Sequence, residues 1–412
     1  MTAPASSPKR FKLGFIGTGG RSVAYAEQYA TSDEIEITAL ADPNAATRKA
    51  MIAQAKLSGT PAEYDDWRDL HAHHPDLDGV VICSPNHLHA DHAVPFLERG
   101  LPIALEKPLA TTQGDCERIL DAERASGGRT LLGFVLRSAP FYKAIHALVR
   151  ANAVGAVCSI EAHEHVRWTT SSLFMRSAWR RLQRTSGGAM LEKCCHDIDI
   201  LNWMVGCRPV SLNSYGNRLM FNPNPSLPES CDTCKVGGDC NYYHTPRNDA
   251  LGEAGDKRLH RFLADGGACV YNTEKDITDV QTVNIEYENG AVANFLMALN
   301  VGGSRGSRNL AINGTQGCVW GDIDRMKVAA YDNRTDKETE HAIVTDGSGH
   351  GGGDKGHAFE LLRMMQDRTY VPGQNAKAGY LSAMMCLAAD VSRLERRRIN
   401  FRYGSNDYIQ LA

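Results

Sequence analysis

The sequence lacks a long apolar stretch and an excess of either charge. No apolar run among its 412 residues approaches the roughly 18 that a membrane-spanning helix requires. The formal net charge of −3 leaves no basic footprint of the kind that binds nucleic acids. The first ten residues are polar and contain no apolar segment typical of a signal peptide, so they predict a short disordered lead. We therefore expect a cytoplasmic protein without a membrane or nucleic-acid partner.

The amino-acid composition and the length are typical of a globular protein with two domains. Hydrophobic residues make up 42% of the chain and charged residues 23%. The length allows two domains or one large one, and no internal repeat or low-complexity tract interrupts it. In a reducing compartment the twelve cysteines are expected to be thiols or metal ligands rather than disulfides.

A glycine-rich turn lies between a strand-like segment at 11–16 and a helix-like segment at 21–31. Glycines permit a tight turn and let backbone amides approach a pyrophosphate at a helix N-terminus. The third position of the usual glycine fingerprint is a serine here. The interpretation as a dinucleotide site therefore depends on the strand before the turn and the helix after it. The predicted cofactor residues of this turn are Gly17, Gly19, Gly20, Arg21 and Ser22.

Asp42 follows the next strand, at 35–41, and comes 23 residues after Gly19. A carboxylate there can accept hydrogen bonds from the ribose diol of an adenosine. It can also cap the helix that begins beyond Pro43, and the two roles are compatible. No basic residue follows until Arg48, so NAD is favoured over NADP.

Strands and helices continue to alternate as far as about residue 135. Further strands are expected near 63–64, 78–83, 102–105 and 130–134. Strands separated by helices of this length form βαβ units, so residues 1–135 predict a Rossmann domain with a doubly wound parallel sheet. The fourth strand leads into polar residues that could line the nicotinamide end of a cofactor or cap the next helix. The predicted cofactor residues of this segment are Ser84, Pro85, Asn86 and His89.

The strand at 102–105 ends at Glu106-Lys107-Pro108. Proline cannot continue the hydrogen-bond ladder, so Lys107 is held at the carboxyl end of a core strand. Ligands of open α/β sheets bind at that edge, which makes Glu106 and Lys107 predicted cofactor-binding residues. Alternatively, Lys107 is a surface lysine that pairs with Glu106.

The second half, residues 136–412, predicts an α+β domain with a large and mostly antiparallel sheet. Strand-like segments occur at 157–166, 280–287, 291–299 and 310–313, and an Asn-Gly turn joins the second to the third. Helices are expected near 187–205 and in the run from 355 to 394, and the last helices could pack back on the first domain.

The helix at 187–205 carries a carboxylate and an imidazole on one face. Glu192 and His196 are four residues apart, and Asp199 follows three residues later. A carboxylate can orient an imidazole and raise its basicity, which suits a general base. The alternative is a partly buried histidine beside exposed acids.

These motifs together resemble the Gfo/Idh/MocA oxidoreductase family over nearly the whole chain. In similar proteins the lysine of a Glu-Lys-Pro motif contacts substrate and nicotinamide, and a histidine is the catalytic acid/base, assisted by an aspartate four residues earlier. The resemblance assigns these roles to Lys107 and His196, with Glu192 at the aspartate position. The matching features are residues 17–22, Asp42, Ser84-Pro85 with His87 and His89, Glu106-Lys107-Pro108, Gly187-Gly188 through His196 and Asp199, and the run from Pro372 through Asp390.

The resemblance implies an NAD-dependent dehydrogenase that acts on a sugar, sugar derivative or polyol, assembled as a homodimer or homotetramer. His196 would take the hydroxyl proton while Lys107 holds the same oxygen. Lys193 and two cysteines replace residues that are small and apolar in similar proteins, which leaves the substrate open. Two alternatives remain: a redox glycoside hydrolase without net NAD turnover, and a non-enzymatic nucleotide-dependent sensor. The predicted substrate residues on or near this helix are Lys107, Lys193, His196 and Asp199.

An arginine-rich stretch precedes this helix. Arg176 and Arg180 would share a helical face and could bind an anionic group of the substrate, while Trp168 could stack on a sugar ring. The alternative is a solvated face paired with acids. Trp168 and Arg176 are accordingly predicted substrate residues.

A cysteine-rich stretch lies in a long, weakly periodic segment at about 217–256. Cys231, Cys234, Cys240 and His244 supply four potential ligands for a structural zinc ion. The alternative is a set of reduced thiols in a loop that packs over the cleft. A structural zinc is therefore one of two interpretations.

Overall fold

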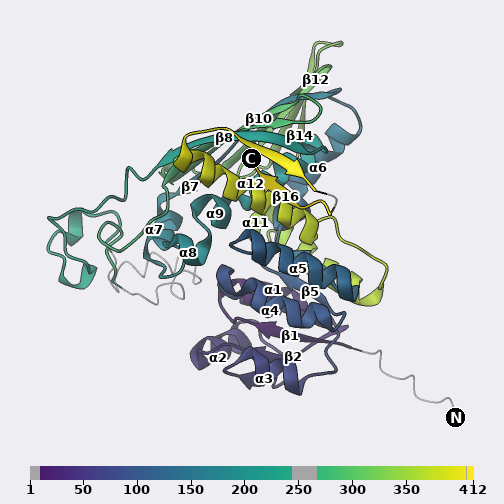
Figure 1. Ribbon diagram of the computed structural model, residues 1–412, viewed down its shortest axis with the longest axis vertical. Helices are drawn as coiled ribbons and strands as arrows, with labels where there is room; N and C mark the ends of the chain where they lie inside the picture. Colours follow the sequence, from purple (N-terminus) through teal and green to yellow (C-terminus); the bar gives the residue numbers. More distant parts are fainter. Residues whose placement is uncertain (1–9, 244–266, 405) are drawn as a thin grey trace.

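The computed structural model describes residues 10–243, 267–404 and 406–412. The predicted lead and His244 lie outside the described residues. Two sheets dominate the molecule: a six-stranded sheet near the N-terminus and a ten-stranded sheet formed by the second half (Figure 1). This confirms the predicted α/β fold class, a Rossmann-like domain followed by a domain with a mostly antiparallel sheet.

The first sheet is parallel throughout, in the order β3-β2-β1-β4-β5-β6. This is the strand order of dinucleotide-binding domains, in which ligands bind where the order reverses direction. Strands β4 and β5 are buried along their whole length, as expected when helices cover both faces. The strands are β1 (Phe11–Ile16), β2 (Ile35–Ala41), β3 (Ala62–Tyr64), β4 (Gly79–Ile82), β5 (Pro102–Leu105) and β6 (Arg129–Leu132).

Helices join these strands, and several begin at a side-chain cap. Asn44 accepts a hydrogen bond from Ala46 N at the start of α2, and Thr112 accepts one from Asp115 N at the start of α5. The helices are α1 (Gly20–Tyr29), α2 (Ala45–Gln54), α3 (Trp67–His73), α4 (His89–Glu98) and α5 (Gln113–Ser126).

The second sheet runs β14-β13-β12-β11-β7-β10-β9-β8-β15-β16 and is antiparallel except where β7 pairs with β10. The four strands predicted here are all present, and the hairpin between β9 and β10 turns at the expected Asn-Gly. The sequence did not identify the strands that extend either edge. The strands are β7 (Val157–Arg167), β8 (Pro209–Asn217), β9 (Val280–Tyr287), β10 (Val292–Val301), β11 (Arg308–Gly314), β12 (Gly317–Asp322), β13 (Lys327–Asp332), β14 (Lys337–Ala342), β15 (Ile399–Tyr403) and β16 (Ile409–Leu411).

Helices α9, α11 and α12 of the second half lie between the two sheets (Figure 1). The run predicted to be helical, 355–394, contains two helices, and Pro372 and Gly373 fall in the turn that separates them. The helices are α6 (Pro140–Arg150), α7 (Trp168–Arg176), α8 (Gln183–Ser186), α9 (Ala189–Val205), α11 (Gly349–Gln366) and α12 (Ala376–Glu395).

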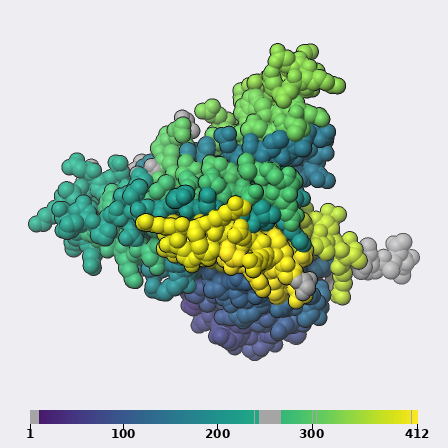
Figure 2. All heavy atoms as spheres, turned by 45° about the horizontal axis from the view of Figure 1, so that its top comes forward, coloured from purple at the N-terminus to yellow at the C-terminus, as the bar shows by residue number. Residues whose placement is uncertain are grey.

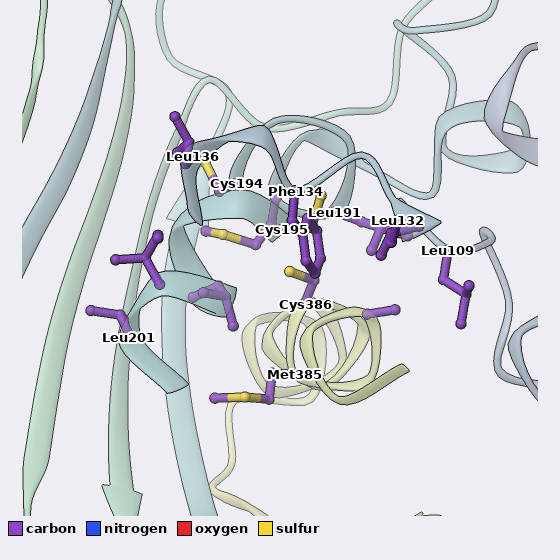
Figure 3. Packing of buried hydrophobic residues seen from close by; sticks show 14 of the residues in the cluster. Leu109, Leu132, Phe134, Leu136, Leu191, Cys194, Cys195, Leu201, Met385 and Cys386 are labelled. Carbon is purple, nitrogen blue, oxygen red and sulfur yellow. The ribbon is translucent and has the colours of Figure 1, made fainter. Parts of the chain in front are cut away.

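Helix α9 is buried on almost every side, and this fixes the side chains that it carries. Its Cys195 lies towards Cys386 of α12, whereas Cys194 lies beside Leu136 on another side of the helix (Figure 3). Ser382 Oγ donates to Cys195 O at 2.7 Å, which adds a polar contact to this packing. A side chain on the first turns of α9 is therefore carried by a rigid element.

The C-terminal helices connect the two halves. Helix α11 packs against α1 and β5, and α12 packs against α5, β6 and α9. The space-filling view shows the C-terminal residues, in yellow, between the purple first domain and the teal and green second domain (Figure 2). Within the part of the chain that the structure describes, no helix is both long and apolar enough to cross a membrane.

Candidate active site

A cleft of about 540 Å³ opens where the carboxyl ends of β1, β4 and β5 face helix α9. It lies at the point where the strand order reverses, as the fold predicts. Most of the predicted site residues meet here. Those that line the cleft are Gly17, Gly19, Gly20, Arg21, Asp42, Ser84, Pro85, Asn86, Glu106, Lys107, Glu192, Lys193 and His196.

The glycine turn has the geometry of a phosphate-binding turn. Gly17 adopts φ +80°, and a Cβ there would lie 2.8 Å from Cys83 O, so only glycine fits. Gly19 has no atom within 4 Å of where a Cβ would point, and it lines the cleft. Ser22, in place of the third glycine, is buried and donates its hydroxyl hydrogen to Gly17 O. Ser22 thus stabilises the turn through this hydrogen bond and is not among the residues that line the cleft.

Helix α1 starts at this turn without a side-chain cap. Its N-cap is Gly19, and its first turn carries no acidic residue. The first amides of an uncapped helix are unsatisfied and favour an anion, and the cleft provides the space for one. These features fit the pyrophosphate of a dinucleotide.

Asp42 lies at the end of β2 and lines the same cleft. Its Oδ2 accepts from Thr18 N at 2.8 Å and its Oδ1 from Asn44 N at 2.9 Å. The cap of α2 is Asn44, so the predicted capping role of Asp42 is wrong. Arg48, the first basic residue after Asp42, is bound by Glu63 at 3.0 Å and by Asp65 at 2.7 Å. The site thus offers a carboxylate where a ribose diol is expected.

Residues after β4 connect that strand to the loop that carries Lys107. Ser84 Oγ lies 2.8 Å from His92 Nδ1, and Asn86 Nδ2 donates to Ser186 O at 3.0 Å, just before α9. His89 is fully buried, with Nδ1 2.7 Å from Pro108 O and Nε2 3.1 Å from Ser84 O. The prediction of His89 as a residue facing the cofactor is therefore corrected: it braces the two strand ends.

Glu106 is the centre of a buried network beneath the glycine turn. Its Oε1 accepts from Arg21 Nε at 2.9 Å and from Tyr25 OH at 2.8 Å. Burial alone would raise the pKa of Glu106, but the charges of Arg21 and Lys107 outweigh it and the pKa is lowered. Arg21 also binds Asp354 Oδ2 at 3.1 Å. The alternative in which Lys107 pairs with Glu106 at the surface is wrong, because Glu106 is buried and bound by Arg21.

Lys107 reaches across the cleft to α9. Its Nζ lies 3.5 Å from Glu192 Oε1 and donates to the main-chain oxygen of Glu192. Arg180 Nε lies 3.0 Å from the same Oε1. Glu192 thus binds two cations, and the expected pairing of Glu192 with His196 is replaced by a carboxylate that holds Lys107.

His196 projects from α9 beside Lys107 and is buried. Burial, reinforced by the positive charge of Lys107, lowers the pKa of His196 well below its usual value. Within the described residues its Nδ1 has no hydrogen-bond partner. Its ring lies 5.8 Å from Phe134 and 6.0 Å from His350, between ring centres. His196 is therefore a neutral imidazole at neutral pH, able to accept a proton.

A buried charge cluster lies next to the cleft. Glu164 binds Lys193 at 3.1 Å and Arg308 at 2.7 Å, and Arg308 also binds Asp197 at 2.8 Å. Burial raises the pKa of Asp197 to about 6, although Arg308 opposes the shift. Lys193 and Arg308 both line the cleft, and the contact of Lys193 with a substrate stays a prediction.

Three predicted substrate residues are not among those that line the cleft in the described structure. Asp199 forms a bidentate pair with Arg137 at 2.6 Å for both bonds, so it does not serve His196. Arg176 is buried and donates to Tyr242 O, and Trp168 contacts the Tyr242 ring edge-on at 6.0 Å. Trp179 and Arg180 of the same stretch line the cleft instead. The predicted helical face shared by Arg176 and Arg180 is wrong, because α7 ends at Arg176 and Arg180 lies in the turn before α8.

Sequence reasoning also missed residues from distant segments. Arg308 comes from β11 and His350 from the first turn of α11. The run Ser-Gly-His-Gly-Gly-Gly-Asp at 348–354 could have pointed to His350. Glycines on both sides of a histidine, followed by an acid, are typical of a tight turn that presents a polar side chain. Arg308 lies in a strand of ordinary composition and gave no signal.

The cysteine segment does not support the predicted zinc site. Cys231, Cys234 and Cys240 line one small cavity of about 10 Å³ with Cys269. Arg176 Nη2 lies 3.7 Å from Cys231 Sγ, so a guanidinium already occupies the space beside that thiol. Among the described residues no group of three or more His, Cys, Asp or Glu could hold a metal ion.

Two family models match the chain. Residues 11–134 match a model described as oxidoreductase family, NAD-binding Rossmann fold, and residues 142–320 match the GFO/IDH/MocA C-terminal domain. Inositol 2-dehydrogenase of Salmonella typhimurium is 26% identical over 281 residues, covering 65% of this chain and 79% of the relative. Levoglucosan dehydrogenase of Pseudarthrobacter phenanthrenivorans is 24% identical over 351 residues, covering 82% and 80%.

Solved structures show the same fold. A levoglucosan dehydrogenase in complex with NADH and levoglucosan has a TM-score of 0.76 at 18% identity, covering 95% of this chain and 99% of that one. GenD2 from gentamicin A biosynthesis, in complex with NAD, has a TM-score of 0.69 at 16% identity, covering 98% and 99%. At these identities the likeness concerns the fold alone.

Proposed function

Because the chain belongs to the Gfo/Idh/MocA family of NAD-binding oxidoreductases, we propose that it transfers a hydride between the nicotinamide of NAD and a carbinol carbon of a sugar-like or polyol substrate. The convergence of Lys107 and His196 supports this proposal. A cationic donor and a neutral imidazole, from two domains, face one cleft beside a glycine turn.

Each residue would have a separate task. When bound, NAD supplies the acceptor for the hydride of the carbinol carbon. His196 accepts the hydroxyl proton, since its lowered pKa keeps the ring neutral. Lys107 donates to the same oxygen and stabilises its developing negative charge. Glu192 orients Lys107 through both its carboxylate and its main-chain oxygen.

A substrate screen with two variants tests the proposal. Purified protein is assayed with NAD and a panel that includes myo-inositol, levoglucosan and common aldoses, and absorbance at 340 nm is followed. We expect Lys107→Ala to lower the rate on the order of 10²–10³-fold and His196→Ala on the order of 10²–10⁴-fold. Both variants should bind NADH with unchanged affinity by fluorescence. A fully active His196→Ala enzyme would contradict the assignment of the base.

The same screen separates the two alternatives. A redox glycoside hydrolase would release a sugar from a chromogenic glycoside without net change at 340 nm, whereas a sensor would bind NADH and turn over no member of the panel. The homodimer or homotetramer stays a prediction, and light scattering of the purified protein will measure it.

A further inference from the structure

The first turn of α11 brings a second histidine to the cleft in an unusual backbone conformation. His350 adopts φ 54° and ψ 42°, a left-handed conformation that is uncommon for residues other than glycine. Gly351 and Gly352 continue it, and a Cβ on Gly349 would lie 2.3 Å from Asp354 Oδ2. The chain thus wraps closely around the Asp354 carboxylate, and this fixes His350 beside it.

Asp354 holds the ring of His350. Its Oδ1 lies 2.9 Å from His350 Nδ1, and its two oxygens lie 3.2 and 3.1 Å from Arg21 Nη1. Burial would raise the pKa of Asp354, but Arg21 and His350 lower it strongly, so the carboxylate is ionised. An ionised carboxylate only accepts hydrogen bonds, so Nδ1 carries the hydrogen and Nε2 presents a lone pair.

His350 differs from His196 in its ability to carry a proton. His196 is enclosed, and the cations Lys107, Arg308 and Lys193 disfavour its charged form. The His350 side chain is 34% exposed and directly bound to an anion. Burial lowers the pKa of His350 as well, and Arg21 and Arg308 add to the shift, but Asp354 and Glu164 oppose it, so the pKa falls less far than that of His196. Of the two rings, His350 is therefore the one placed to pass a proton on to solvent.

We propose that His350, positioned by Asp354, is a second proton-transfer residue of the cleft and accepts the proton that His196 removes from the substrate. This inference rests on the proposed dehydrogenase function. The O–H bond of the substrate breaks as an N–H bond forms on His196. That N–H bond then breaks, and the proton moves through one bridging hydroxyl or water oxygen to His350 Nε2 and on to solvent. The ring centres are 6.0 Å apart, a separation that one bridging oxygen can span.

The experiment compares His350→Ala, His196→Ala and the double variant, with His341→Ala on β14 as the matched control. We expect His350→Ala to lower kcat on the order of 10²-fold with little change in KM, and added imidazole to restore at least a tenth of the lost rate. Because the two residues act in series, the double variant should be no slower than His196→Ala. NADH binding should be unchanged throughout.

Several outcomes would overturn the proposal. Unimpaired kcat in His350→Ala, or a loss that multiplies with that of His196→Ala and falls mainly on KM, would make His350 a substrate-binding residue only. A wild-type protein inactive on the whole panel would overturn the dehydrogenase function and the relay together. An active wild type with an unimpaired His350→Ala variant would overturn the relay alone.

The role of Asp354 has a readout that needs no turnover. Histidine-labelled protein should show His350 as the Nδ1–H tautomer by long-range ¹H–¹⁵N spectra. Asp354→Asn should reverse the tautomer and shift the acidic limb of the rate profile, and Asp354→Glu should restore both. A wild-type His350 in the Nε2–H form would contradict the positioning role.

Discussion

At the scale of single residues, the main finding is that Glu192 forms its ion pair with Lys107 and not with His196. The spacing of Glu192 and His196 along α9 suggested a carboxylate–imidazole pair. In the structure the Glu192 carboxylate lies between Lys107 Nζ at 3.5 Å and Arg180 Nε at 3.0 Å. Two cations compete for one buried anion, and each offers a stronger interaction than a neutral imidazole does. Glu192 is therefore a residue that positions Lys107.

Glu192→Gln tests this assignment. The amide keeps the shape of the side chain but removes the charge that holds Lys107, so kcat should fall on the order of 10²-fold through misplacement of the Lys107 ammonium. Because Glu192 binds cations and not His196, the acidic limb of the pH–rate profile should stay in place. The matched control is Glu161→Gln, at an exposed position of β7. A shifted acidic limb would restore the pairing with His196 that the resemblance implied.

Asp42 leads to a prediction about the cofactor. A carboxylate at the ribose position gains charged hydrogen bonds from NAD and repels the 2′-phosphate of NADP. The difference should be worth roughly 1.5–3 kcal/mol, or about 10- to 150-fold in Kd, by isothermal calorimetry. Arg48, already bound by Glu63 and Asp65, should not offset it. Equal affinities for the two nucleotides would show that Asp42 does not face the ribose.

At the scale of elements, α11 does the most to complete the site. Its first turn carries His350, Asp354 follows four residues later, and the helix packs against α1 and β5 of the first domain. His357 lies on this packed face, fully buried near the Tyr25 ring, with a separation of 5.9 Å between ring centres. Within the described residues neither of its ring nitrogens has a hydrogen-bond partner. The helix thus contains an ionisable group that folding keeps neutral.

This burial predicts a loss of stability in mild acid. Burial lowers the pKa of His357 to about 4, against an ordinary value of 6.5. Below pH 6.5 His357 binds a proton in the unfolded chain but not in the folded chain. The free energy of unfolding therefore falls as the pH drops from 6.5 towards 4. His357→Leu should therefore gain roughly 2 kcal/mol over wild type between pH 7.5 and pH 5 in urea unfolding. The control is His73→Leu, at an exposed position. An unchanged difference between the two pH values would contradict the account.

At the scale of the whole molecule, α11 and α12 pack against elements of both halves of the chain. Arg129 of β6 binds the end of α11, donating to Met364 O at 2.7 Å, Asp367 O at 2.9 Å and Tyr370 O at 2.8 Å. Leu132 N donates to Gln374 O at 2.8 Å just before α12 begins. The edge of the first sheet thus holds both C-terminal helices, and with them the residues that α11 brings to the cleft.

Arg129→Ala tests this connection. The change removes three charged hydrogen bonds to carbonyl oxygens at the end of α11, and it should cost roughly 1.5–3 kcal/mol in the free energy of unfolding. Thermal unfolding should show a Tm lowered by a few degrees, and NADH should protect the variant less than wild type. Arg68→Ala is the control, because an exposed pair with Asp66 contributes little. Unchanged NADH protection would mean that α11 is held by its apolar packing alone.

The sequence by itself determined the parts of this protein that depend on local order. Neighbouring residues predict the strand, glycine turn and helix at 11–31. They also predict where β4 and β5 end. Parallel strands present their carboxyl ends at one edge, so the order of the strands was enough to predict that Gly17, Asp42, Ser84 and Lys107 share a cleft. The same reasoning identified the helix that carries His196.

Only the tertiary structure decided which charges meet. Glu192 pairs with Lys107, Asp199 with Arg137, and Arg308 with Glu164 and Asp197, each across elements far apart in the chain. Helical spacing shows which residues share a face but not what that face packs against, so it suggested the wrong partners for Glu192 and Asp199. His350 reaches the cleft because α11 returns to the first domain. A pairing between distant segments depends on packing, which a local pattern of residue types does not record.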